Sequence, residues 1–373
     1  MASKVRLQDL LGLLNGLYPP TLAETWDNVG LQVGDPQGGV ERVLIALDPT
    51  PAAVAAAGRS GAQVLLCHHP LLFRPLSRLT PEDAVGQTVW AAIEHSVAVI
   101  SLHTNLDRAA NGLNRWLADT LGLVDSVPLL PAAGDYLKLV VFVPENHAEA
   151  VAAALFAGGA GQIGAYDQCA FRTTGTGSFR PQAGTTPYLG TIGQTERVTE
   201  IRLETILPKN RLTRCLEKMR RAHPYEEVAY DLIPLANQVP AAGLGRIGLL
   251  PAEIDLAAFA AQVKTTLGCS HLRLVGAPER TIGKVAVCGG SGAECLAAAR
   301  FQGADLLVTG DLKYHEARRA EELGLALIDA GHFATERLMV THLRDALQPA
   351  AVQKGWQLEF QAYTEETDPF RIL

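Results

Sequence analysis

Metal-binding side chains follow three separate apolar runs of this chain. The run at 64–67 ends in His68 and His69, the run at 97–102 is followed by Asp107, and the run at 325–330 is followed by His332 and Glu336. Neutral imidazole and carboxylate groups are the ligands of borderline divalent metals in proteins. Because the carboxyl ends of parallel strands meet at one edge of a sheet, we expect these five side chains to converge.

Five ligands exceed what one tetrahedral zinc site uses, so the set fits two metal ions better. In a binuclear site a carboxylate can bridge the ions, and a water molecule shared between them can attack an electrophile. Adjacent side chains of a strand point in opposite directions, so His68 and His69 can each serve a different ion. His332 and Glu336 are four residues apart, which places them on one face of a helix that begins near Phe333.

Each candidate also has an ordinary structural explanation. A histidine pair can arise by chance, Asp107 suits a turn or a helix cap, and Glu336 suits the first turn of a helix. The metal hypothesis therefore depends on the three strand ends taken together.

Further candidates for chemistry lie near these segments. His103 follows the same run as Asp107 and is either a proton carrier beside the metals or a buried core histidine. His315, in "GDLKYHE" with Asp311, is either an acid/base or a surface helix residue. The last group, Trp26, Asp27 and Asn28 in "TWDNVGLQVGD", is either the wall of a substrate pocket or a loop with a core tryptophan.

The sequence around these residues alternates between short apolar runs and Ala-rich helical stretches. This pattern predicts βαβ units, with mostly parallel sheets buried on both faces. Two parts of the chain repeat it: "GAQVLLCHH" aligns with "GADLLVTGD", and "VISLHTNLD" aligns with "LIDAGHFATE", in the same order. We therefore predict a duplicated, three-layer α/β core.

The middle of the chain follows a different order of elements. Residues 131–239 predict strand, helix, two strands, helix and strand, which is the βαββαβ order of a ferredoxin-like α+β domain. We expect this domain to be inserted into the core, so that residues 1–130 and 240–373 form the two halves of the metal-binding part.

Composition narrows the function classes. The 373 residues are 48% hydrophobic and carry a net charge of −7, without a long basic stripe, so nucleic-acid binding is not expected. The six cysteines are scattered, and neither a signal peptide nor a long apolar segment is recognisable. We therefore expect a cytoplasmic protein with free thiols and no membrane partner.

Several motifs together resemble one known family. "TWDNVGLQVGD", "CHHPLLF", "SLHTNLD", "TGD" followed by "YH", and "DAGHFATE" are similar to the signature of the Nif-three-like family, whose members carry the name GTP cyclohydrolase 1 type 2 homolog. The segment "HPYEEVAYD" resembles the long bacterial members, which have a PII-like or CutA-like insert. The resemblance implies a two-metal centre with all five ligands, Glu336 as the bridge, and a toroidal homohexamer.

Three functions are compatible with these residues. The first is a metal-dependent hydrolase of a purine nucleotide, with ring opening of GTP implied by the resemblance and with His103 or His315 moving protons. The second is a binuclear phosphoesterase that uses the same ligands. The third is a non-enzymatic metal-binding ring whose insert senses a small ligand or a partner. Zn, Fe, Mn, Co or Ni would suit the three imidazoles, whereas Mg and Ca prefer oxygen ligands.

Overall fold

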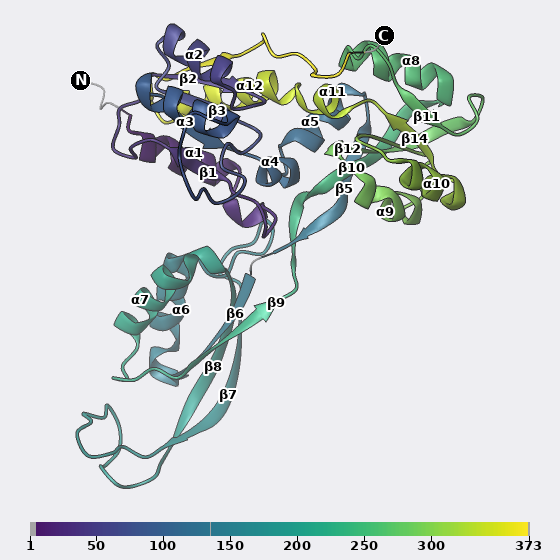
Figure 1. Cartoon of the computed structure of the whole chain (residues 1–373). Helices are drawn as coiled ribbons and strands as arrows, with labels where there is room; N and C mark the ends of the chain where they lie inside the picture. Colours follow the sequence, from purple (N-terminus) through teal and green to yellow (C-terminus); the bar gives the residue numbers. More distant parts are fainter. Residues whose placement is uncertain (1–4, 135, 372–373) are drawn as a thin grey trace. The chain divides into compact units, whose positions relative to one another are not determined.

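The computed structural model describes residues 5–134 and 136–371, which form two compact units (Figure 1). One unit is the continuous segment Ala133–Val239, and the other combines the described residues before and after it. Within the described part of the chain, no helix has the length and apolar character needed to span a bilayer.

The first sheet of the discontinuous unit has five strands in the order β1-β4-β3-β2-β15. Their bounds are β1 Gly30–Val33, β2 Arg42–Ala46, β3 Val64–Cys67, β4 Ala98–Ser101 and β15 Glu359–Ala362. Strands β15, β2, β3 and β4 run parallel, and β1 pairs with β4 in the antiparallel direction. Every residue of β3 and β4 is buried, which explains why these strands are continuous apolar runs in the sequence.

The second sheet has six strands in the order β11-β14-β13-β12-β10-β5. Their bounds are β5 Val124–Ala133, β10 Gln238–Asp255, β11 Arg273–Val275, β12 Thr281–Ser291, β13 Leu306–Gly310 and β14 Ala326–Asp329. Strands β12, β13 and β14 are parallel, whereas β11 and β10 pair antiparallel with β14 and β12. The expectation of mostly parallel sheets therefore fits the first sheet, and the second is mixed.

Four strands of each sheet repeat one arrangement. The order β1-β4-β3-β2 in the first sheet corresponds to β11-β14-β13-β12 in the second, and each has one antiparallel strand beside three parallel strands. The aligned sequence segments occupy corresponding places, since β3 corresponds to β13 and β4 to β14. The carboxyl ends of β3, β4 and β14 are the positions from which the candidate ligands extend.

Helices complete the discontinuous unit (Figure 1). They are α1 Leu7–Leu17, α2 Pro51–Ser60, α3 Ala84–Glu94, α4 Thr104–Arg108, α5 Leu113–Thr120, α8 Leu256–Leu267, α9 Leu296–Phe301, α10 Tyr314–Leu323, α11 His332–Glu336 and α12 Met339–Gln353. The short helices α4 and α11 begin within a few residues of the ends of β4 and β14, so they hold their side chains beside those strand ends.

The continuous unit has a four-stranded antiparallel sheet in the order β7-β8-β6-β9 with two helices. Its elements are β6 Tyr136–Pro144, α6 Ala148–Gly158, β7 Ala170–Phe179, β8 Glu196–Pro208, α7 Leu212–Ala222 and β9 Tyr230–Leu235. Leu139 and Val141 of β6 and Leu203 of β8 pack with Val151 of α6 and Met219 of α7 in one core. The helices therefore cover one face of the sheet.

Candidate metal centre

The structure brings the five candidate ligands together around the carboxylate of Glu336. Glu336 Oε1 lies 3.7 Å from His68 Nε2. Its other oxygen, Oε2, lies 3.1 Å from His69 Nε2 and 2.9 Å from His332 Nε2. Asp107 Oδ1 completes the group at 3.5 Å from His68 Nε2. The two oxygens of Glu336 thus face two different sets of side chains.

Buried polar atoms of this cluster have no hydrogen-bond partner. His68 is fully buried and Glu336 is 4% exposed, yet His68 Nε2, Asp107 Oδ1 and Glu336 Oε2 are all without one. Buried polar atoms are nearly always paired, and an ion is one explanation for a group that is not. Among the described residues, two groups of side chains have ligand atoms close enough to hold one metal ion, namely His69 with His332 and Glu336, and His68 with His69 and His103. The residues present therefore fit a divalent metal.

An acceptor at Nδ1 orients each of the three imidazoles. His68 Nδ1 lies 2.8 Å from the carbonyl oxygen of Leu102, which can only accept, so Nδ1 carries the proton and Nε2 turns to the cluster. His69 Nδ1 lies 2.7 Å from Asp48 Oδ1, and His332 Nδ1 lies 2.7 Å from Asp311 Oδ2. This arrangement is typical of metal-binding histidines.

The imidazole and carboxylate groups of the cluster shift one another's pKa values. Burial lowers the pKa of His69, but the adjacent carboxylates of Asp48 and Glu336 outweigh it and raise the value to about 10. The adjacent carboxylate of Glu336 also raises the pKa of His332, to about 9. For Glu336, burial favours the neutral form, yet the charge of His68 and the imidazole contacts hold its pKa well below the usual range. Without a metal, the nearby carboxylates therefore favour the protonated forms of His69 and His332.

A glycine makes room for Glu336. Gly290 has a φ of +60°, and a Cβ at this position would lie 2.2 Å from Glu336 Oε1. Its N–H donates to Thr335 Oγ1 at 3.0 Å, which ties β12 to α11. The Gly-rich stretch at 289–292 thus lets the backbone approach the carboxylate closely.

His103 is paired with Asp27 beside the cluster. His103 Nδ1 lies 2.9 Å from Asp27 Oδ1, and the other carboxylate oxygen accepts from the N–H of Thr104 at 3.0 Å and from its hydroxyl. Burial raises the pKa of Asp27, but these bonds prevail and lower it to about 2. The His103 ring centroid is 5.2 Å from that of His68. Asp27, which the sequence predicts as part of a pocket wall, has a side chain with no exposed surface and orients His103.

Trp26 and Asn28 have different positions in the same loop. Trp26 is 57% exposed and lies edge-on to Phe73 and His103, with ring centroids 5.8 Å and 6.1 Å away. Asn28 Nδ2 donates to the carbonyl oxygen of Leu72 at 2.5 Å, so it fixes the segment that follows His69. An exposed aromatic pair, Trp26 with Phe73, therefore borders the cluster.

His315 is not among the described residues that contact the cluster. It is exposed on α10, and its ring is edge-on to Tyr314 with a centroid distance of 5.3 Å. Among the described residues, no hydrogen bond or ion pair joins it to the cluster.

Two acidic residues that support the cluster did not emerge from the sequence. Asp48 follows β2, another buried apolar run, so the strand-end signal that found His68 could have found it. Glu366 lies in the irregular segment after β15 and has no comparable signal. Its carboxylate accepts the N–H groups of Leu47 and Asp48, both at 2.8 Å, which fixes the loop that carries Asp48.

Known proteins with the same sequence pattern and fold identify the family. The family model of Duf34/NIF3 (NGG1p interacting factor 3) matches residues 5–369. A Halalkalibacterium halodurans protein named GTP cyclohydrolase 1 type 2 homolog is 41% identical over 367 residues, covering 98% of each chain. A Bacillus subtilis protein of the same name is 37% identical over 374 residues, covering 100% of each. The crystal structure of a Bacillus cereus protein related to NIF3 superposes with a TM-score of 0.85 at 41% identity, again covering 100% of each chain. The mixed α/β chain described above is therefore a member of the Duf34/NIF3 family.

Proposed function

We propose that this protein holds two divalent transition-metal ions per chain and hydrolyses a nucleotide. The observation that carries the proposal is the position of Glu336, whose Oε1 faces His68 and whose Oε2 faces His69 and His332. A carboxylate shared in this way can bridge two ions. Asp107 would complete the ligands on the His68 side, and Zn, Fe, Mn, Co or Ni would suit this donor set.

The bound metals would supply a polarised, activated water and stabilise negative charge. The chain's own residues would orient the substrate and move protons. His103 donates through Nδ1 to Asp27, so its Nε2 is free to accept or donate a proton beside the cluster. The exposed rings of Trp26 and Phe73 offer a surface on which a base can stack. The name shared by the bacterial relatives supports GTP as the first substrate to test.

Metal content tests the binuclear proposal directly. Elemental analysis of protein purified without added metal should find about two ions per chain. Glu336→Gln and His69→Ala should lower that content to about one or less, because each removes a ligand. His315→Ala is the matched control, since it removes an exposed histidine outside the cluster. An unchanged metal content in both cluster variants would contradict the proposal.

Turnover tests the hydrolase assignment separately. Metal-loaded protein should convert GTP, and His103→Ala should lower kcat by about a hundredfold or more, as expected for loss of a proton carrier. His315→Ala should leave kcat unchanged, because the geometry supports His103 in this role. Activity that persists after chelation would reject the hydrolase.

A second candidate is a metal-binding protein without catalysis. The burial of the ligands around His68 favours this candidate, because a substrate could hardly reach an ion there. His68 has no exposed surface, and the side chain of Glu336 is only 5% exposed. In this case the protein would contain metal but would turn over neither GTP nor a phosphoester.

We also propose that Ala133–Val239 is a ferredoxin-like insert and that the protein assembles as a homohexameric ring. The element order β6-α6-β7-β8-α7-β9 and the antiparallel strand order β7-β8-β6-β9 support the insert. The ring is inferred from the family resemblance, and light scattering of the purified protein would measure its mass.

A further inference from the structure

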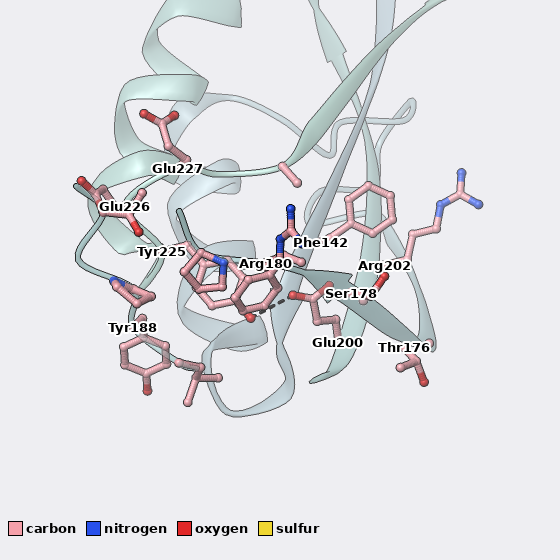
Figure 2. Close-up of a pocket in the computed structure, with 18 of the residues that line it drawn as sticks. Phe142, Thr176, Ser178, Arg180, Tyr188, Glu200, Arg202, Tyr225, Glu226 and Glu227 are labelled. Atoms are coloured by element: carbon pink, nitrogen blue, oxygen red, sulfur yellow. Dashed lines mark hydrogen bonds between the residues drawn. The ribbon is translucent and has the colours of Figure 1, made fainter. Parts of the chain in front are cut away.

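The continuous unit contains a cavity that no residue of the metal cluster lines. Its volume is about 630 Å³, within the range of small-molecule sites. Strands β7 and β8, the segment at 179–189 and the segment at 225–229 surround it (Figure 2). Four aromatic side chains contribute to its wall, namely Phe142, Phe179, Tyr188 and Tyr225.

A buried carboxylate lines this cavity. Glu200 is 8% exposed, and the alternation along β8 turns it away from the face on which Ile201 and Leu203 pack against the helices. A Cβ on Gly177 of the neighbouring strand would lie 2.0 Å from Glu200 Oε2, so glycine at this position makes room for the carboxylate.

Only one oxygen of Glu200 is satisfied by the protein. Its Oε1 accepts the hydroxyl of Tyr225 at 2.9 Å, the bond drawn in Figure 2. Burial and the neighbouring Glu200 raise the pKa of Tyr225, so the hydroxyl stays protonated and donates. Among the described residues, no donor reaches Oε2 and no cation pairs with Glu200. A ligand in this cavity can satisfy Oε2 with a hydrogen-bond donor, such as an N–H group.

The aromatic wall favours a flat ligand. The ring centroid of Tyr225 lies 5.8 Å from that of Phe179 and 6.2 Å from that of Tyr188, and both pairs are tilted. Stacking of a heteroaromatic base on such side chains is a common mode of nucleotide binding.

A cation at the same cavity favours a ligand that also carries an anion. Arg180 lines the cavity, and no carboxylate of the described residues pairs with its guanidinium. Arg202, the other arginine of the lining, already pairs with Glu204 at 3.0 Å. Arg180 is therefore available for a phosphate group.

We propose that this cavity is a binding site for a guanine nucleotide, separate from the metal cluster. Guanine presents two adjacent donors, N1–H and the 2-amino group, which match the carboxylate of Glu200. Adenine presents an acceptor, N1, in the equivalent position, and a carboxylate would repel it. The rings would stack on the base, and Arg180 would bind the phosphate. This inference does not depend on the proposed hydrolase.

Calorimetry of the metal-free, full-length protein tests the site with GMP, AMP, guanosine and inorganic phosphate as probes. GMP should bind at about one per chain, and AMP about tenfold or more weakly, because an unpaired buried acceptor is costly. Glu200→Gln should weaken GMP binding about tenfold or more. Arg180→Ala should weaken GMP binding but not guanosine binding, because guanosine lacks the phosphate.

Two controls locate the binding. Glu149→Gln removes the same charge from an 86% exposed side chain on α6 and should change GMP affinity by less than about twofold. All four tryptophans lie outside residues 133–239. GMP in the cavity therefore contacts no tryptophan of its own unit, whereas GMP at the metal cluster should quench Trp26.

Two outcomes would contradict the proposed nucleotide site. One is equal affinity for GMP and AMP. The other is GMP binding that is lost in the His69→Ala variant but kept in the Glu200→Gln variant. If circular dichroism shows that Glu200→Gln does not fold, Arg180→Ala decides, because that residue is exposed. Unchanged GMP binding by Arg180→Ala would then reject the proposal.

Discussion

At the residue scale, the carboxylates behind the imidazoles determine how well the cluster can hold a metal. Asp48 fixes the tautomer of His69 through a 2.7 Å contact at Nδ1. Asp48→Asn keeps the shape but removes the charge, so metal affinity should fall about 10–100-fold. Competition with a chelating dye measures this change. Asp119→Asn is the control, because Asp119 forms an exposed ion pair with Arg115; equal affinities in the two variants would refute the role of Asp48.

The raised pKa values of the two outer histidines predict how the stability of the metal-free protein depends on pH. His69 and His332 have folded pKa values of about 10 and about 9, against 6.5 for the free group. A group whose pKa is raised on folding stabilises the protein fully below its unfolded pKa, and this stabilisation is lost as the pH rises through the folded value. The free energy of unfolding should therefore fall between pH 6.5 and about 10.

Denaturant unfolding across that pH range measures the effect. The double variant His69→Ala with His332→Ala should show a flatter profile, because both titrating groups are gone. A wild-type profile that rises with pH, or one that matches the double variant, would show that these imidazoles are not protonated in the metal-free protein.

At the scale of elements, the close contact between β12 and α11 depends on a glycine, Gly290. Gly290→Ala would place a Cβ 2.2 Å from Glu336 Oε1 at a φ of +60°. We expect a loss of stability of about 1 kcal/mol or more and a lower metal content, because the carboxylate must move. Gly324→Ala is a matched control, since Gly324 has a φ of +66° and nothing within 4 Å of its Cβ position.

Both variants should lose stability from backbone strain, but only Gly290→Ala should lose metal. Elemental analysis and denaturant unfolding separate the two effects. Normal metal content in Gly290→Ala would mean that Glu336 tolerates a displacement.

The elements that carry the cluster could be predicted because they are local in sequence. The buried strands β3, β4 and β14 are apolar runs, and their carboxyl ends carry His68, Asp107 and His332 within a few residues. The contacts of His68 with Asp107 and Glu336 show that these ends meet in the structure. The same reasoning would have included Asp48, which follows β2 in the same way.

Other features depend on contacts between distant segments, so no local pattern reveals them. Glu366 supports Asp48 from an irregular segment more than three hundred residues away in sequence. Asp27 looks like a loop residue until the fold places it against His103. The cavity around Glu200 requires the pairing of β7 with β8, because Gly177 on one strand makes room for a side chain on the other.

At the scale of the whole molecule, one unit is built from two segments of chain that are separated by the other. Arg246, on the returning strand β10, is 1% exposed and donates through Nη2 to the carbonyl oxygens of Ala109 and Ala110. These carbonyls follow α4, the helix that carries Asp107. The second segment thus stabilises the loop after α4, and it also supplies His332 and Glu336.

The continuous unit should be removable without loss of the metal cluster. Its ends are adjacent, since the N–H of Gly134 donates to the carbonyl oxygen of Asn237 at 2.6 Å, so a short Gly/Ser turn can replace Ala133–Val239. The shortened protein should fold cooperatively and keep its metal content, because all five candidate ligands and Arg246 remain. It should also lose GMP binding, because Glu200 and Arg180 are gone. Circular dichroism, elemental analysis and calorimetry check the three expectations, and a folded but metal-free product would show that the cluster needs the inserted unit.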